Sequence, residues 1–260
     1  MNVDEMLEAA TSDFFWVPDD VQVVDREAIT YSYSPRSEGN FNRVTRVRPQ
    51  LADPGALVEE VYDRHLGSES LWCVNPMSDE PTMREALRQF GYKTGHTHHA
   101  YAVDPATYDR DLPQGVEVRE VSTLEDLRTL YDIWVDVFDR QPDLTDQELA
   151  NELDDCTGAH RRIARFVAFR NGEAAGSGGL TFFDDLSFGL IWAGSVREEH
   201  RGRGVYTTLL QARADAAADR GIERIGLYAR DETSAPIVDA HGFERHGFMT
   251  YYEQDLTGET

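Results

Sequence analysis

The chain has 260 residues, a formal net charge of -23 and a hydrophobic share of 40%, which allows one large domain or two small ones with real cores. No apolar run approaches the roughly 20 residues that a membrane span requires. A strongly acidic chain without a basic face also excludes nucleic acid as the expected partner. The stretch "MNVDEMLEAA" at the start is acidic where a secretory signal is basic, so we expect a cytoplasmic protein with neither a membrane nor a nucleic-acid partner.

The acidity has two explanations, and both stay open. Only Lys93 among the 25 basic residues is a lysine, and the acidic residues are spread along the chain. This pattern fits adaptation to high salt, where the Debye length falls to about 3 Å at molar concentration, or attraction of a cationic substrate. The cysteines Cys73 and Cys156 lie far apart in sequence and are predicted to be reduced thiols without a metal.

The first block ends with "SLWCVNPMSDEPTMREALRQFGYKTGHTHHAYAVD", which predicts a strand, a helix, a Gly-aromatic pair at Gly91-Tyr92 and a second strand. The cluster "HTHH" places His96 and His98 on one strand face, but no clear carboxylate or cysteine partner completes a metal site. We therefore predict a strand surface there and no metal. The polar, proline-bearing stretch 103–115 follows, and we predict domains at residues 1–110 and 116–260.

The second block opens with a predicted strand, "GVEVREV", and continues with apolar residues at helical spacing over 124–138. Ser122 and Glu125 are predicted to form a capping box at the start of this helix. Thr145 and Glu148 predict a second capping box and a second, shorter helix.

The remaining elements alternate strands with helices. Asn171-Gly172 lies between two strand-like runs and predicts a β-hairpin, and "LSFGLIWAGSV" predicts a third strand. A long helix, the strand "RIGLYAR", the short helix "TSAPIVDAHGF" and the final strand "GFMTYYEQDL" follow. The resulting order is strand, two helices, three strands, helix, strand, helix, strand.

The stretch "SVREEHRGRGVYTTLL" at 195–210 predicts a strand over 190–196, a loop, and a helix from about Gly204. The first turn of a helix has free backbone N–H groups and the positive end of the dipole, so it favours an anion. Arg201 and Arg203 add positive charge, and phosphate is the expected anion. The pattern is neither a Walker P-loop nor a dinucleotide fingerprint, and an exposed turn that binds nothing remains the alternative.

These residues resemble the signature of the GNAT acyltransferases, Arg/Gln-x-x-Gly-x-Gly/Ala at the start of the helix after the fourth strand. Arg201 and Gly204 match it, whereas Tyr206 stands where the family has a small residue. The order of elements over 116–256 also agrees with the family. The resemblance implies an α/β (α+β) GNAT fold, a central mixed sheet flanked by helices. The first block, whose final elements echo those of the second, is expected to be a smaller degenerate GNAT-like α/β domain.

The resemblance further implies acetyl-CoA as cosubstrate. Backbone N–H groups of residues 201–206 would hold the pyrophosphate, and the bulged strand before them would pair with the pantetheine arm and orient the thioester. The residues implied for coenzyme A binding are Gly194, Ser195, Val196, Arg201, Gly202, Arg203, Gly204, Val205, Tyr206 and Asp231.

The general acid of many family members is a tyrosine, and Val238 occupies its place here. Tyr228 and His241 are the candidate catalytic substitutes. The expected activity is acetyl transfer to a primary amine of a small-molecule or peptide acceptor by direct attack, and the chain is expected to be a monomer or homodimer. The alternative is a coenzyme A-binding module without turnover, which the missing tyrosine and Tyr206 permit.

Overall fold

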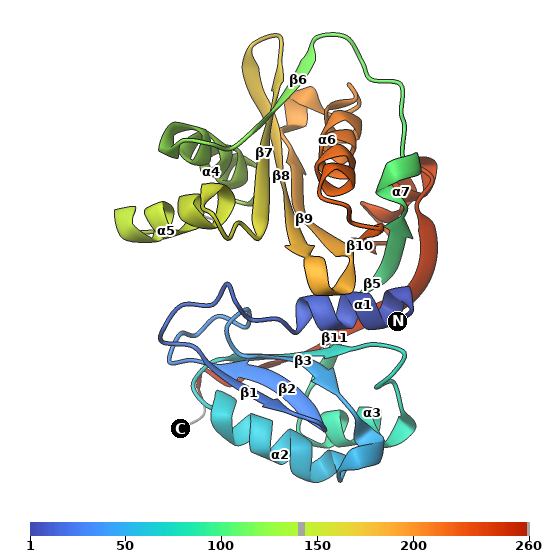
Figure 1. Cartoon of the computed structure of the whole chain (residues 1–260). Helices are drawn as coiled ribbons and strands as arrows, with labels where there is room; N and C mark the ends of the chain where they lie inside the picture. Colours follow the sequence, from blue (N-terminus) through green and yellow to red (C-terminus); the bar gives the residue numbers. More distant parts are fainter. Residues whose placement is uncertain (140–143, 259–260) are drawn as a thin grey trace. The chain divides into compact units, whose positions relative to one another are not determined.

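The computed structural model describes residues 1–139 and 144–258, and these residues form two compact units (Figure 1). Unit 1 consists of Met1–Tyr101, Tyr228–Ala240 and Glu244–Thr260, and unit 2 consists of Ala102–Leu227 and His241–Phe243. The expected domains were two consecutive segments, the second ending at residue 260, beyond the described range. The observed units are not consecutive because the last strand of the chain pairs with a strand of unit 1.

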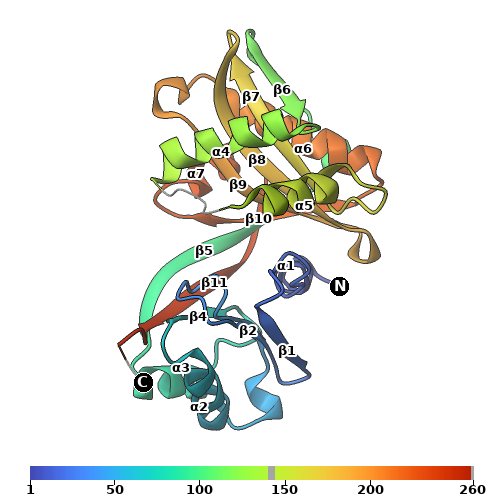
Figure 2. The same ribbon diagram turned by 90° about the vertical axis from the view of Figure 1, so that its left-hand side faces the viewer.

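The sheet of unit 1 has the strand order β1-β2-β3-β4-β11-β5. Helix α1 covers one face, and α2 and α3 pack together on the other (Figure 2). Apolar side chains of β2, β3, β4, α2 and α3 fill the core between the sheet and these helices. The elements are α1 (Val3–Thr11), β1 (Gln22–Arg26), β2 (Ile29–Tyr33), β3 (Arg43–Val47), α2 (Pro54–His65), β4 (Glu69–Val74), α3 (Pro81–Gln89), β5 (Lys93–Val103), α7 (Ala235–Ala240) and β11 (Glu244–Asp255).

The predicted similarity between the final elements of the two blocks is visible in the backbone after α3 and after α7. Gly91 and Gly242 follow these helices with φ of 85° and 74°, a left-handed conformation that glycine adopts at little cost. Each is followed by an aromatic residue and a strand, as the sequence predicts.

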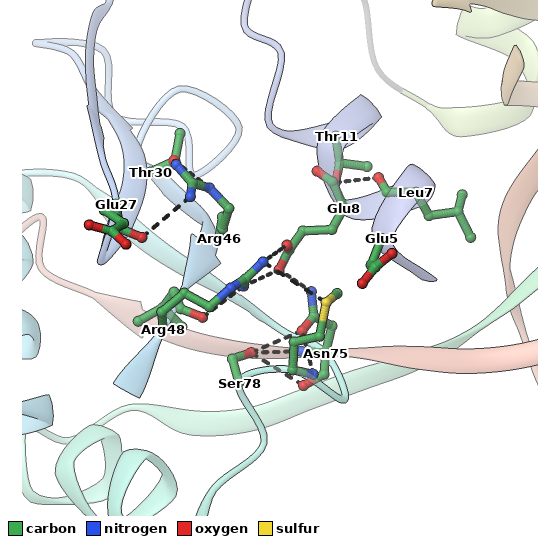
Figure 3. A network of polar contacts seen from close by, with 12 residues as sticks. Glu5, Leu7, Glu8, Thr11, Glu27, Thr30, Arg46, Arg48, Asn75 and Ser78 are labelled. Atoms are coloured by element: carbon green, nitrogen blue, oxygen red, sulfur yellow. Dashed lines mark hydrogen bonds and ion pairs between the residues drawn. The ribbon is translucent and has the colours of Figure 1, made fainter. Parts of the chain in front are cut away.

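A buried polar network anchors α1 within unit 1 (Figure 3). The Glu8 carboxylate is 3% exposed and accepts hydrogen bonds from Arg48 Nη1 at 2.8 Å and from Asn75 Nδ2 at 2.6 Å. Arg48 Nη2 donates to its other oxygen, and the N–H of Asn75 donates to Ser78 Oγ at 3.1 Å. Because a buried carboxylate is costly unless it is paired, we assign this network to stability rather than to catalysis.

The sheet of unit 2 has the order β10-β9-β8-β7-β6. Helices α4 and α5 lie on one face and α6 lies on the other (Figure 1). The hairpin between β7 and β8 turns at Asn171 and Gly172, whose φ values of 53° and 87° confirm the predicted turn. The elements are β6 (Val116–Glu120), α4 (Leu124–Phe138), α5 (Asp146–Thr157), β7 (Ile163–Arg170), β8 (Glu173–Phe183), β9 (Phe188–Val196), α6 (Val205–Asp219) and β10 (Arg224–Arg230). Four short 3-10 helices complete the described elements: η1 (Pro49–Leu51), η2 (Pro105–Thr107), η3 (Asp184–Leu186) and η4 (Glu198–His200).

The helix caps correct one prediction and confirm another. The N-cap of α4 is Thr123, and its capping box is formed with Asp126 rather than by Ser122 with Glu125. The Asp126 carboxylate accepts the N–H groups of both Ser122 and Thr123, which fixes the helix start one residue later. The predicted capping box of α5, between Thr145 and Glu148, is present.

No helix in the described residues combines the length and the apolar character that crossing a membrane requires.

Candidate functional site

The loop before α6 is shaped by two glycines in the left-handed conformation. Gly202 has φ of 68° and Gly204, the N-cap of α6, has φ of 78°. A Cβ on Gly204 would overlap Cγ of Pro113, whereas one on Gly202 would meet no atom within 4 Å. The chain therefore needs glycine at 204 for its own packing, and the bare backbone at 202 is open to a ligand.

The N-terminus of α6 is uncapped by any side chain. In the described structure, the helical hydrogen bonds of α6 start at Thr208, whose N–H donates to Gly204 O at 3.0 Å. The N–H groups of Val205, Tyr206 and Thr207 precede it, and such groups remain available for a ligand. Together with the helix dipole, they form a site for an anion.

Arg201 and Arg203 are exposed beside these N–H groups. Arg201 Nε donates to Val196 O at 3.2 Å, which holds its side chain against the end of β9. In a chain of net charge -23, this pair provides a local positive patch. Two carboxylates, Glu198 and Glu199, precede the patch in η4, and the phosphate site stays a prediction.

Strand β9, which leads into this loop, carries a bulge. Ala193 has φ of 49°, and the register against β8 shifts between Ser177 and Gly179. A bulge reorients the backbone groups next to it. The three predicted strand residues adjoin this point: Gly194 is exposed, Ser195 is buried with its Oγ 2.7 Å from Ser177 Oγ, and Val196 ends the strand.

Past its short ladder with β10, one edge of β9 is open. The parallel ladder with β10 joins Phe188–Leu190 to Arg224–Gly226, and β9 continues to Val196. The backbone of residues 191–196 can therefore pair with an extended ligand along that edge, as a strand would. Unit 2 alone thus combines an open strand edge, a bulge and a helix N-terminus in consecutive residues.

These features agree with a comparison to known families. Residues 127–248 match the model of the acetyltransferase (GNAT) family. This segment is a GNAT domain.

Solved structures resemble the chain over nearly its whole length. A GCN5-related N-acetyltransferase from Kribbella flavida has a TM-score of 0.72 and 14% identity, covering 98% of this chain and 96% of that one. A tandem GNAT protein from the clavulanic acid biosynthesis pathway has a TM-score of 0.65 and 13% identity, covering 98% and 87%. A GCN5-related N-acetyltransferase from Sphaerobacter thermophilus has a TM-score of 0.63 and 18% identity, covering 91% and 76%. At these identities the likeness concerns the fold, and the tandem protein supports a GNAT-like architecture in two halves. No curated protein matches the chain in sequence.

We call residues 201–207 of the GNAT domain, which form the loop before α6 and its first turn, the α6 cradle. His241 lies in the same unit as this cradle. Its Nε2 is 2.8 Å from Thr207 Oγ1 in the first turn of α6. Its carbonyl accepts from Arg110 Nη2, and its ring meets that of Tyr206 edge-on. The structure therefore places this candidate next to the cradle.

The other predicted residues belong to unit 1. Tyr228 is largely enclosed, and burial raises the pKa of its phenol far above the ordinary value near 10. Val238, at the position of the family's tyrosine, is fully buried. Asp231 is bound to His99 Nε2 at 2.9 Å and lies near Arg245, so its carboxylate already has partners within its own unit.

The histidine cluster also has protein partners. Arg230 Nε donates to His98 Nε2 at 3.0 Å, and burial, assisted by the Arg230 charge, lowers the pKa of His98 to about 4. His99 is bound to Asp231. Within residues 1–139 and 144–258, His, Cys, Asp and Glu side chains form no group of three suited to a metal ion.

The α4 face of the GNAT domain's sheet holds a buried ion pair that the sequence analysis missed. Arg165 is 4% exposed, its Nη1 binds Glu152, and its guanidinium lies over the rings of Tyr131, Trp134 and Trp192. Burial raises the pKa of Tyr131, which donates to Glu152. Helices α4 and α5 thus bring a carboxylate and aromatic surface to the sheet face opposite α6.

The α6 face holds a second missed residue, Arg213, which is fully buried. Val205, Leu209, Arg213 and Ala217 follow one another at intervals of four, so they share one helix face. An arginine within this otherwise apolar stripe was the available sequence signal.

Proposed function

We propose that the GNAT domain transfers an acetyl group from acetyl-CoA to a primary amine. One observation carries this proposal. In unit 2 an open β9 edge, a bulge at Ala193 and the uncapped N-terminus of α6 follow one another along the chain. Acetyl-CoA supplies an activated thioester and a pyrophosphate. In the proposal, the pyrophosphate lies on the N–H groups of residues 202–207 and the extended arm lies along residues 194–196.

The chemical step needs few protein groups. The amine lone pair attacks the thioester carbonyl carbon, an oxyanion forms, and the carbon–sulfur bond then breaks to release the thiolate. A backbone N–H at the bulge is suited to hold that oxyanion, a contribution of about 3 kcal/mol when such a donor is well placed. The amine loses its proton to water, and the thiolate leaves without a protein acid. The acceptor is a small molecule or a peptide.

The absence of a tyrosine at position 238 favours a second candidate, a module that binds coenzyme A without turnover. The two are separated by measuring thiol release from acetyl-CoA against a panel of amines, together with a thermal shift induced by coenzyme A. Thiol release that depends on an amine supports the enzyme. Binding without release over a broad panel supports the module, and neither binding nor release contradicts both.

The cradle is tested by replacing its two exposed arginines. The double variant Arg201→Gln/Arg203→Gln should weaken coenzyme A binding about tenfold or more, since each charge-assisted contact to phosphate contributes roughly 1.5–3 kcal/mol when desolvated and less when exposed. Arg119→Gln is the matched control, because Arg119 is exposed on β6 and pairs with Glu117. Unchanged affinity in the folded double variant would contradict the proposed phosphate site.

The absence of a protein acid is tested at Tyr228 and His241. We expect Tyr228→Phe and His241→Gln each to retain turnover within about threefold, well below the roughly 10² loss of a general acid. The rate should rise with pH as the amine deprotonates. A falling limb at high pH that disappears in either variant would show that the residue is the acid.

A further inference from the structure

Arg213 has an unusual environment within unit 2. Its side chain is fully buried between α6 and the sheet, and its Nε donates to Leu209 O at 2.9 Å. Its Nη1 and Nη2 atoms, by contrast, have no hydrogen-bond partner in the described part of the chain. A guanidinium has five N–H donors, so most of this donor capacity is unused.

No carboxylate compensates this charge among the described residues. Arg213 is absent from the ion pairs of unit 2, whereas the other buried arginine, Arg165, is paired with Glu152. Burial lowers the pKa of Arg213 against a smaller opposing effect of the Tyr206 side chain, and an arginine stays protonated at physiological pH. An isolated buried charge is very costly, so the site is expected to be completed by an anion.

A second buried donor lies beside α6. The hydroxyl of Tyr108 is buried and has no partner in the described structure, and Gln211 Nε2 holds its carbonyl to α6 at 3.0 Å. Burial raises the pKa of Tyr108, whereas Arg110 and, to a smaller extent, the charge of Arg213 act to lower it. Unused N–H and O–H donors without an acceptor fit a group that only accepts hydrogen bonds, such as a carboxylate.

The guanidinium adjoins the bulge of β9. A Cβ built on exposed Gly194 would lie 3.6 Å from Arg213 Nη1 and 2.8 Å from Tyr206 Cε2, and one on Gly178 would lie 2.9 Å from Nη1. Arg213 therefore rests against bare backbone, one atomic layer below the exposed bulge, and its guanidinium lies 5.7 Å from the centre of the Tyr206 ring. The ring of Tyr206, the residue that departs from the family signature, packs against Gly194 beside Arg213.

We propose that Arg213, with Tyr108 and Tyr206, forms a subsite for a carboxylate at the end of the acyl chain of the donor thioester. This inference rests on the proposed function, because it assumes that the thioester carbonyl is held at the bulge. Because the guanidinium adjoins the bulge at Gly194, the proposal extends an acyl chain that is longer than acetyl by a few bonds from the bulge to Arg213. The donor class is then a dicarboxylic acyl-CoA, with succinyl-CoA as the probe.

The test compares succinyl-CoA with butyryl-CoA, whose acyl chain has the same number of carbons and no charge. By calorimetry, the wild-type protein should bind succinyl-CoA about tenfold more tightly than butyryl-CoA, the scale of a charge-assisted hydrogen bond. Arg213→Met should reduce this ratio to about one, and Arg119→Met should leave it unchanged. If Arg213→Met does not fold, Tyr108→Phe removes one donor and should reduce the ratio about threefold.

The outcomes separate this inference from the proposed function. Equal affinity of the wild-type protein for both thioesters overturns the carboxylate subsite and leaves acyl transfer intact. No binding of coenzyme A or of either thioester overturns both proposals. Free succinate that binds as tightly as succinyl-CoA, with loss of binding in Arg213→Met, would assign the site to a free anion and overturn its link to the acyl chain.

Discussion

Gly202 and Gly204 form a matched pair for measuring what the cradle loop requires of its backbone. Both have positive φ, so alanine at either position costs about 1–2 kcal/mol through the left-handed conformation alone. Only at Gly204 does the added Cβ overlap Pro113, whereas at Gly202 it enters open space. Steric overlap of this kind costs a further 1–3 kcal/mol, roughly.

We therefore expect Gly202→Ala to destabilise the protein by about 1–2 kcal/mol and Gly204→Ala by about 2–5 kcal/mol. At about 2–4 °C per kcal/mol for a chain of this size, the melting temperature falls by about 2–8 °C in the first variant and about 4–20 °C in the second. Calorimetric scans of both variants measure the difference. Coenzyme A titrations of the folded variants then show whether Gly202→Ala also weakens binding by blocking the open backbone.

Equal losses of melting temperature in the two variants would refute the steric reasoning about Pro113. The comparison also explains why a β-branched residue at 204 is a poor test of ligand binding. Such a variant would disturb the loop before any ligand arrives.

Three further predictions concern the chain as a whole. Burial raises the pKa of Cys73 to about 11 and of Cys156 to about 12, so a disulfide reagent at pH 8 should label the native thiols at least about 10²-fold more slowly than a free cysteine. Fast labelling detected by mass spectrometry would contradict their burial. His65 is buried against Ser70 Oγ and Ser32 O, and burial lowers its pKa from 6.5 to about 4, so the unfolded chain binds the proton first. The neutral, buried His65 therefore contributes about 3 kcal/mol to the free energy of unfolding above pH 6.5, and this contribution is lost as the pH falls toward 4. Urea unfolding should show a smaller loss of stability over this pH range in His65→Gln than in the wild-type protein. Finally, if the acidity is an adaptation to salt, the unfolding midpoint should rise with KCl up to molar concentration, and full stability at low salt would contradict that explanation.

Local signals were sufficient for most of the elements but not for the way they are grouped. The Asn171-Gly172 turn, the α5 capping box and the helix start after Gly204 depend on neighbouring residues, so they are readable in sequence. The pairing of β11 with β4 joins residues about 180 positions apart, and no short-range pattern encodes it.

The same distinction applies to the candidate site. The glycines and arginines of the cradle form one short motif, whereas the environment of Arg213 depends on Gly178 and Gly194 from two different strands. The position of an arginine on an apolar stripe was visible, but the absence of a partner for it was not. Such an absence is a property of the assembled packing, because it depends on every side chain that reaches the same space.

The return of the chain to unit 1 at its end has a consequence for synthesis. As the protein emerges from the ribosome, β4 is made early, but its antiparallel neighbour β11 comes from the last residues of the chain. Until then β4 has β3 on one side and an unpaired edge on the other, which exposes hydrogen-bonding groups to other chains. The residues of unit 2, by contrast, are complete once Phe243 has been added. We therefore expect the later-encoded unit to fold first and the N-terminal segment to wait for the C-terminus, so that removal of residues 244–260 should leave unit 1 aggregation-prone during translation.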